Sequence, residues 1–141
     1  MIAVQTDDFS VEDVHNELRQ RAGDCGAMVS FVGLVREFGG NASIQAMTLE
    51  HYPGMTEKAL MKIALHACEK WGLVDALIIH RVGPLLPNDR IVFVAAASAH
   101  RKNAFRACEF MIDTLKTDAP FWKQEDTPNG RRWVSADAGS S

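Results

Sequence analysis

The sequence predicts an α+β protein made of one domain that covers residues 1–141. After a first helix, strand-like and helix-like segments follow one another in the order strand-strand-helix-strand-strand-helix-strand, which does not fit the regular alternation of a parallel βαβ winding. A chain of 141 residues suits one domain, and it can bury roughly 68–70% of the surface that its unfolded form exposes. No internal repeat and no linker interrupts this pattern.

The first predicted helix begins after Ser10 and ends near Gly23. Ser10 is a typical N-cap residue, and Asp13 occupies the capping-box position three residues later. Phe9 and Val14 are spaced for a hydrophobic staple across this cap. We expect this helix to have a structural role.

Two strands and a loop are predicted next. The segment "AMVSFVGLVR" (27–36) is a nearly continuous apolar run, which predicts a buried strand. Residues 37–43 form a glycine-bearing loop, and "IQAMTLEHY" (44–52) is expected to pair with the strand before it.

The second helix is predicted from its cap, its spacing and its stop signal. Pro53 and Gly54 form a turn, Thr56 can cap the helix, and Gly72 ends it. Apolar residues recur between these limits at helical spacing: Leu60, Ile63, Ala64, Ala67 and Trp71.

The rest of the chain predicts three strands and a helix. Strands are expected over 76–83, 91–98 and 131–136, with a turn at 87–90, and residues 136–141 are expected to be a frayed tail. The helix runs over 102–116, and its apolar residues occupy one arc of about 160°: Ala104, Phe105, Ala107, Cys108, Met111, Ile112 and Leu115. Phe110 lies nearly opposite that arc, so we expect it to be exposed and to mark a second contact surface, such as a subunit interface.

Composition excludes several classes of protein. The net charge of −3 argues against a general nucleic-acid binder, so an anion site must be a local cluster of cations. No apolar run approaches the ~20 residues that span a bilayer, and "MIAVQTDDFS" is too polar for an export signal. We therefore expect a cytoplasmic protein with no membrane contact.

The cysteines and histidines suggest no metal centre. The three cysteines form no CxxC pair, which argues against a zinc ribbon and against a thioredoxin-type site. Their odd number, in a chain where no signal peptide is expected, fits a reducing compartment. Cys68 and Cys108 read as core residues, whereas Cys25 lies in a possible turn, which leaves a cysteine-based persulfide carrier open. The histidines show no metal-ligand spacing, so no metal is expected.

A first cluster of cations lies in "SAHRKNAF" (98–105), where a buried strand ends and a helix begins. His100, Arg101 and Lys102 sit at a helix N-terminus, which already carries about half a positive charge. Such an arrangement fits a phosphate site. Spacing alone leaves open that these side chains simply point into water.

A second cluster lies in "LKTDAPFWKQED" (115–126). Lys116 falls at the border of the helix's apolar arc, and the following proline forces a turn. Burial of Phe121 and Trp122 would anchor that turn and fix Lys123 in a cleft shared with Lys116. An ammonium among aromatic rings and a second cation should have a lowered pKa, which suits proton transfer or nucleophilic attack. The alternative is that both lysines are solvated and only flank Phe121 and Trp122, which fill part of the hydrophobic core.

Two further residues are weaker candidates. Arg36 ends the first buried strand, and its guanidinium could pair with a carboxylate or phosphate or form a surface ion pair. Glu125 could serve as an acid, a base or a lysine partner.

Several segments together resemble one family. "FVGLVRE", "LEHYPGMTEKAL", "IIHRVGPLLPND", "SAHRKNAF", "LKTDAPFWKQE" and "GRRWV" resemble, in order and almost without gaps, the MoaE family, the large catalytic subunit of molybdopterin synthase. The resemblance runs from about Gly26 to Val134. It implies an α/β hammerhead fold with an additional small antiparallel sheet.

The resemblance also implies an activity and its partners. Members of this family transfer two sulfurs to cyclic pyranopterin monophosphate (precursor Z), forming the dithiolene of molybdopterin in molybdenum cofactor biosynthesis. The sulfur comes from the C-terminal thiocarboxylate of a small ubiquitin-like subunit. Two large subunits form a homodimer at the centre of a heterotetramer, and no bound cofactor is implied. The alternative function is a non-catalytic module that binds a phosphorylated metabolite or a peptide tail.

Site residues follow by the same resemblance. Lys116 and Lys123 match the two catalytic lysines, and His100, Arg101 and Arg36 match positions that bind the pterin or its phosphate. The adjoining substrate-binding segments correspond to Leu34, Val35, Gln124 and Glu125. One departure is Asp137, where the family often has an arginine, so the rim of the pocket is expected to differ there.

Overall fold

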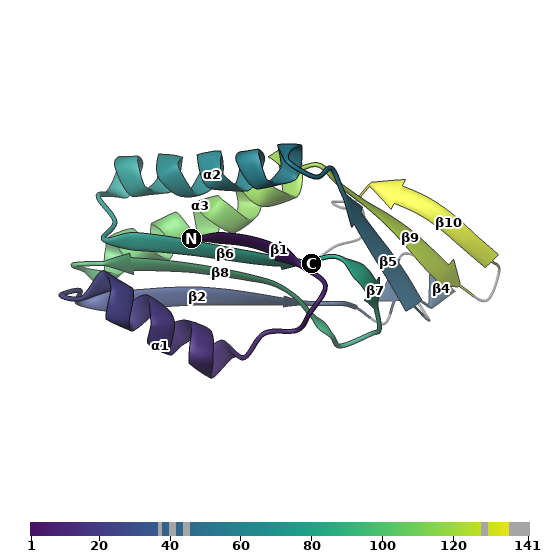
Figure 1. The fold of residues 1–141 in the computed structure, drawn as a ribbon, viewed down its shortest axis with the longest axis horizontal. Coiled ribbons are helices and arrows are strands. Elements are labelled where there is room, and N and C mark those ends of the chain that lie inside the picture. The colour runs from purple at the N-terminus through teal and green to yellow at the C-terminus, as the bar shows by residue number, and fades with distance from the viewer. Residues whose placement is uncertain (37, 40–41, 44–45, 128–129, 136–141) are drawn as a thin grey trace.

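The computed structural model describes residues 1–36, 38–39, 42–43, 46–127 and 130–135, and within this part it is an α+β fold of helices and two main sheets, as predicted (Figure 1). The helices are α1 (Val11–Ala22), α2 (Met55–Trp71) and α3 (Arg101–Asp118). The strands are β1 (Ile2–Gln5), β2 (Ala27–Leu34), β3 (Phe38–Gly39), β4 (Ala42–Ser43), β5 (Ala46–His51), β6 (Asp75–Arg81), β7 (Gly83–Leu85), β8 (Arg90–Ser98), β9 (Phe121–Thr127) and β10 (Gly130–Ser135). Among the described helices, none is both long and apolar enough to cross a bilayer.

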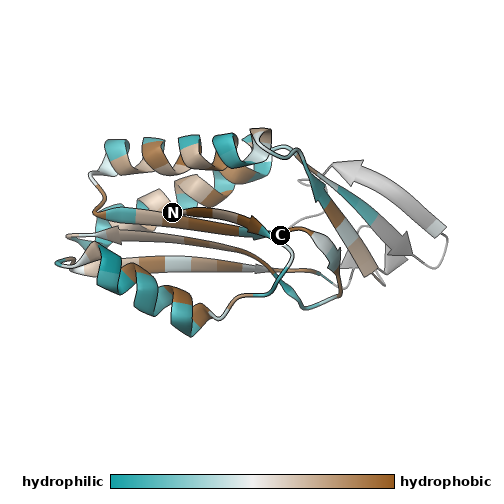
Figure 2. Cartoon of the chain, viewed as in Figure 1, coloured by the Kyte–Doolittle hydropathy of each residue, from teal (hydrophilic) through white to brown (hydrophobic). Residues whose placement is uncertain are grey.

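The first sheet has the strand order β1-β6-β8-β2 and is covered by helices on both faces (Figure 1). Helices α2 and α3 lie on one face and α1 on the other. Side chains of β8 alternate between the two cores: Val94 belongs to the cluster beneath α2 and α3, and Phe93 to the cluster beneath α1. Because both faces are covered, the central strands read as continuous apolar runs, which appear as brown ribbons in Figure 2.

The strand over 27–36 is confirmed as β2, but it is only partly buried. It occupies the edge of the first sheet, pairs with β8 alone, and most of its side chains are half-buried. Its apolar run therefore does not mark a central strand.

The second sheet is antiparallel, with the order β10-β9-β5-β7. We expected the segment 44–52 to pair with 27–36, and this was wrong. Its strand β5 pairs instead with β7 and β9, which come later in the chain. The reason is that β2 already pairs with β8, and the residues between β2 and β5 include a separate pair, β3 and β4. The predicted tail 136–141, with Asp137, lies outside the described residues.

Most of the predicted helix ends are confirmed. In α1, the Ser10 hydroxyl accepts a hydrogen bond from the Asp13 amide at 3.2 Å, as the capping pattern predicts. At the end of α2, Gly72 adopts the left-handed conformation with a φ of 58°.

Thr56 does not cap α2 as expected. The Glu57 carboxylate accepts the Gly54 amide at 3.0 Å instead. The fully buried Thr56 hydroxyl accepts from the Tyr52 amide and donates to the Pro120 carbonyl, both at 2.9 Å. Thr56 thus ties the beginning of α2 to the chain just before β9.

The two phenylalanines of α3 exchange the places that we expected for them. Phe110 is half-buried, because α2 packs beside α3 and brings the rings of His66 and Trp71 to 5.2 Å from it. Phe105 is the exposed aromatic residue, with 62% of its surface accessible. The spacing of apolar residues along α3 alone does not show which of its faces α2 covers.

Candidate functional site

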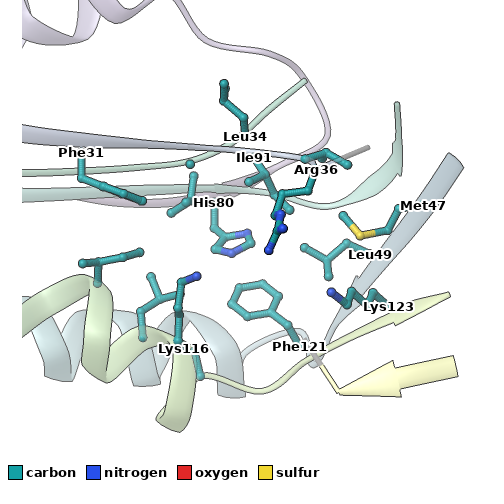
Figure 3. Close-up of a pocket in the computed structure, with 16 residues that line it drawn as sticks. Phe31, Leu34, Arg36, Met47, Leu49, His80, Ile91, Lys116, Phe121 and Lys123 are labelled. Atoms are coloured by element: carbon teal, nitrogen blue, oxygen red, sulfur yellow. The ribbon is translucent and has the colours of Figure 1, made fainter. Parts of the chain in front are cut away.

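A pocket lies where the first sheet meets the second, beside the C-terminal end of α3 (Figure 3). It contains about 740 Å³ of empty space, part of it open to solvent. Most of the lining is apolar, and its polar side chains are Arg36, His80, Lys116 and Lys123. No Asp or Glu is found in the lining as far as the structure describes the chain. An apolar pocket with a few convergent cations suits an anionic organic ligand.

Lys116 reaches the pocket from the last turn of α3. Ile112, Leu115 and Ala119 lie on the same stripe of the chain and line the pocket with it. Burial, followed by the nearby charge of Lys123, lowers the pKa of Lys116, while Asp113 acts in the opposite direction. The predicted cleft shared by the two lysines is therefore present in the structure.

Lys123 is directed into the pocket by the alternation of β9. Side chains two residues apart on a strand share a face, so Phe121 and Lys123 both line the pocket and both are buried. Trp122 has the opposite orientation and is 44% exposed, which corrects our expectation that it would be an anchor of the turn. Only 4% of the Lys123 surface is accessible.

The segment after β2 contributes three of the predicted residues. Leu34, Val35 and Arg36 all line the pocket. Val35 is fixed by its backbone, since its amide donates to the Asp89 carbonyl at 2.9 Å and its carbonyl accepts from the Asn88 amide at 2.7 Å. Leu34 and Arg36 are exposed at the pocket rim.

His100 and Arg101 lie elsewhere on this chain. Both are exposed at the N-terminal end of α3, and neither lines the pocket. At 1.5 Å per residue, Arg101 is roughly 23 Å along the helix axis from Lys116. Within a single chain these cations and the two lysines are at opposite ends of one helix.

The two residues that follow Lys123 are not brought into the pocket lining. Gln124 is half-buried and belongs to the other face of β9. Glu125 pairs through its backbone with Met47, and its side chain lies outside the described part of the structure.

His80 is a pocket residue that the sequence interpretation missed. It lies in β6, is 6% exposed, and stacks on Phe121 with 3.9 Å between ring centroids and 22° between ring planes. Its Nδ1 is 2.8 Å from the Arg81 carbonyl oxygen. Burial lowers the pKa of His80 to about 4, although this hydrogen bond acts to raise it. The available signal was a polar residue inside the apolar run "ALIIHRVG".

Possible metal ligands and the cysteine thiols are the remaining candidates for chemistry. Over the described residues, no group of three or more His, Cys, Asp or Glu side chains is arranged to hold a metal ion. All three cysteines are free. Burial raises the pKa of Cys108 to about 11 and also raises the pKa of Cys68, so both thiols stay protonated at neutral pH.

Comparisons with known proteins agree on one family. The family model described as "MoaE protein" matches residues 4–118. The "Molybdopterin synthase catalytic subunit" of Ralstonia nicotianae is 53% identical over 135 residues, which cover 96% of this chain and 77% of that protein.

Solved structures have the same fold. The "Molybdopterin biosynthesis MoaE protein" of Burkholderia ambifaria MC40-6 is 53% identical, with a TM-score of 0.86 over 97% of this chain and 90% of that chain. The crystal structure of molybdopterin synthase from Staphylococcus aureus contains a chain that is 34% identical, with a TM-score of 0.85 over 94% of this chain and 95% of that chain.

Proposed function

The chain belongs to the MoaE protein family, and we propose that it acts as the catalytic subunit of a molybdopterin synthase. In this proposal it transfers two sulfurs from the C-terminal thiocarboxylate of a small ubiquitin-like subunit to precursor Z. The observation that carries the proposal is the meeting of Lys116, Lys123 and Arg36, from three separate parts of the fold, in one largely apolar pocket. The substrate phosphate and the incoming carboxylate-like tail are both anions, and this pocket supplies the matching charge.

The two lysines have different surroundings, which suggests different roles. Lys116 is only partly buried at the end of a helix, where it can meet an incoming tail, orient the thiocarboxylate and stabilise developing oxyanion charge. Lys123 is deeply buried on β9, where it can act as general acid or base near the pterin. The reverse assignment would satisfy the same geometry.

The proposed chemistry uses the sulfur of the partner and a water molecule. The thiocarboxylate sulfur attacks an oxygen-bearing carbon of the pterin side chain, and the carbon–oxygen bond breaks as the carbon–sulfur bond forms, so that the oxygen leaves with the phosphate or as water. The new carbon–sulfur bond links the substrate to the C-terminal glycine of the small subunit. Water then hydrolyses the bond between that sulfur and the glycine carbonyl, which leaves the sulfur on the pterin and a carboxylate on the small subunit. A second small subunit repeats the cycle. The half-buried Cys68 and the buried Cys108 have no part in it.

His100 and Arg101 enter this proposal through a second copy of the chain. They lie too far along α3 to reach the pocket that contains Lys116 in their own chain. In a homodimer, the N-terminal end of one α3 could reach the pocket of the other subunit and bind the substrate phosphate there. With a small subunit at each end, the assembly is a heterotetramer.

A cytoplasmic location completes the proposal. The three cysteines are all free, which suits a reducing compartment.

The test is a reconstitution. The protein is mixed with precursor Z and a small subunit that carries the C-terminal thiocarboxylate, and dithiolene formation is measured. Lys116→Ala should lower turnover by roughly 100-fold or more, since loss of one oxyanion donor costs about that much, while the variant still binds the small subunit. No product from the folded wild-type protein would contradict the proposal.

The same variant decides the alternative of a non-catalytic binding module, because such a module would show only a change in affinity. Cys25→Ala examines the remaining possibility of a persulfide carrier. If that variant keeps full activity, Cys25 is not a persulfide carrier.

A further inference from the structure

His80 lies in the middle of the proposed active site, and the chemistry above does not use it. Figure 3 shows its ring above Phe121, with the ends of Lys116 and Arg36 on either side. Strand β6 positions it, and the stacked Phe121 ring restricts its orientation. A polar ring at the centre of an apolar lining calls for a chemical reason.

The hydrogen bond of His80 determines which nitrogen faces the pocket as an acceptor. The Arg81 carbonyl can only accept, so Nδ1 must carry the proton and donate to it. In the neutral ring, Nε2 is then an unprotonated acceptor. Nε2 has no hydrogen-bond partner among the described residues, yet every fully covered side-chain nitrogen or oxygen in this part of the chain has one. Nε2 must therefore reach the open space of the pocket.

The groups that face His80 are donors. Lys116 approaches from α3, Lys123 from β9 and Arg36 from the end of β2, and the charge of His51 on β5 also disfavours protonation of the His80 ring. In their charged forms the two lysines and the arginine only donate hydrogen bonds. They can bind the anionic parts of a ligand, but they cannot receive a hydrogen bond from its N–H or O–H groups.

We propose that Nε2 of His80 accepts a hydrogen bond from an N–H or O–H group of the substrate's heterocycle and so sets the orientation of the substrate beside the two lysines. This inference rests on the proposed function. A reduced pterin ring system carries several N–H donors and a flat apolar surface, and the lining offers an acceptor and aromatic rings to match them. The same contact would discriminate against ring systems that present only acceptors at this point.

A matched pair of variants tests the contact. His80→Phe keeps a ring that can stack on Phe121 but removes the acceptor, and His80→Gln keeps an acceptor oxygen at a similar distance from the backbone. Binding of precursor Z is measured by calorimetry without the small subunit, after thermal unfolding has confirmed that each variant is folded. We expect His80→Phe to bind about tenfold more weakly and His80→Gln to recover most of that loss. Equal affinities of wild type and His80→Phe would overturn the inference, as would a His80→Gln variant that binds no better than His80→Phe.

A second measurement needs no substitution. Nitrogen-15 NMR of the wild-type protein reports the protonation of each imidazole nitrogen. We expect His80 to be the Nδ1–H tautomer at neutral pH, and its Nε2 resonance to move to the hydrogen-bonded range when precursor Z saturates the protein. A resonance that stays in place at saturation would refute the contact even if the variants failed to fold.

The outcomes also separate this inference from the proposed function. If the wild-type assembly makes dithiolene and His80→Phe binds precursor Z normally, only the role of His80 is wrong. If the wild-type assembly makes no dithiolene while Nε2 still responds to precursor Z, the proposed catalysis fails and the contact stands.

Discussion

Burial keeps the imidazole of His80 neutral at pH values where an exposed histidine gains a proton. Its pKa falls from 6.5 to about 4, mainly because the charged ring would lose its hydration. Between these two values the unfolded chain binds a proton at this position and the folded chain does not. Stability contributed by the neutral ring is therefore present above pH 6.5 and is lost as the pH falls toward 4.

This difference in pKa predicts that the free energy of unfolding depends on pH and that His80 causes part of this dependence. As the pH is lowered from 6.5 to 4, the free energy of unfolding of the wild type should fall by up to about 3 kcal/mol more than that of His80→Phe. Urea unfolding of both proteins at half-unit pH steps measures the two slopes. Parallel slopes would mean that folding does not lower the pKa of His80, and the ring would then be neutral only above about pH 6.5.

At the scale of elements, β9 determines which side chains enter the pocket. Its alternation buries Phe121 and Lys123 and leaves Trp122 at the surface, where it contacts Tyr52 with 5.9 Å between ring centroids. Phe121→Ala should destabilise the protein by roughly 3–5 kcal/mol, because it empties a buried position. Trp122→Ala should cost less than about 1 kcal/mol, because that ring is largely solvated. Thermal unfolding measures both, and a larger loss for Trp122→Ala would show that the orientation of the strand is reversed.

Thr56 connects two elements, and its hydroxyl group can be tested separately from its shape. Thr56→Val keeps the volume but leaves the Tyr52 amide and the Pro120 carbonyl without this partner, so it should cost about 1–3 kcal/mol. Thr56→Ser keeps the hydroxyl and should cost less. Urea unfolding measures the stability of both variants. If Thr56→Ser is as destabilising as Thr56→Val, the hydroxyl group is not what stabilises this connection.

Local signals in the sequence predicted the elements better than their pairing. The cap at Ser10 and the stop at Gly72 depend on a few adjacent residues, and both are confirmed. Strand β9 was missed because "FWKQEDT" is mostly polar, and it is β5 and β10 on either side that make it a strand. The pairing of β5 with β9 joins segments about half the chain apart, which no local pattern specifies.

At the scale of the whole molecule, the site too could be predicted only where its residues are close in sequence. The cleft shared by Lys116 and Lys123 could be predicted, because the two residues are close in sequence and joined by a turn. His80 could not be predicted as their neighbour, because only the meeting of β6 with the second sheet brings it there. In the proposed homodimer, the positions of His100 and Arg101 relative to the lysines depend on a second chain, which the sequence of one chain does not describe.

A mixed dimer tests whether the active site is shared between chains. Lys116→Ala and Arg101→Ala are co-expressed with different affinity tags, and dimers that carry both tags are purified. If each pocket takes Lys116 from one chain and Arg101 from the other, one pocket is intact and the second lacks both residues, so activity should return to about half of the wild-type value.

The matched control combines Lys116→Ala with Lys123→Ala. Both lysines line the same pocket of one chain, so each pocket of this dimer lacks one lysine and no activity should return. If the first mixed dimer is as inactive as the control, Arg101 does not serve the pocket of a partner subunit, and the proposed route for binding the substrate phosphate is wrong.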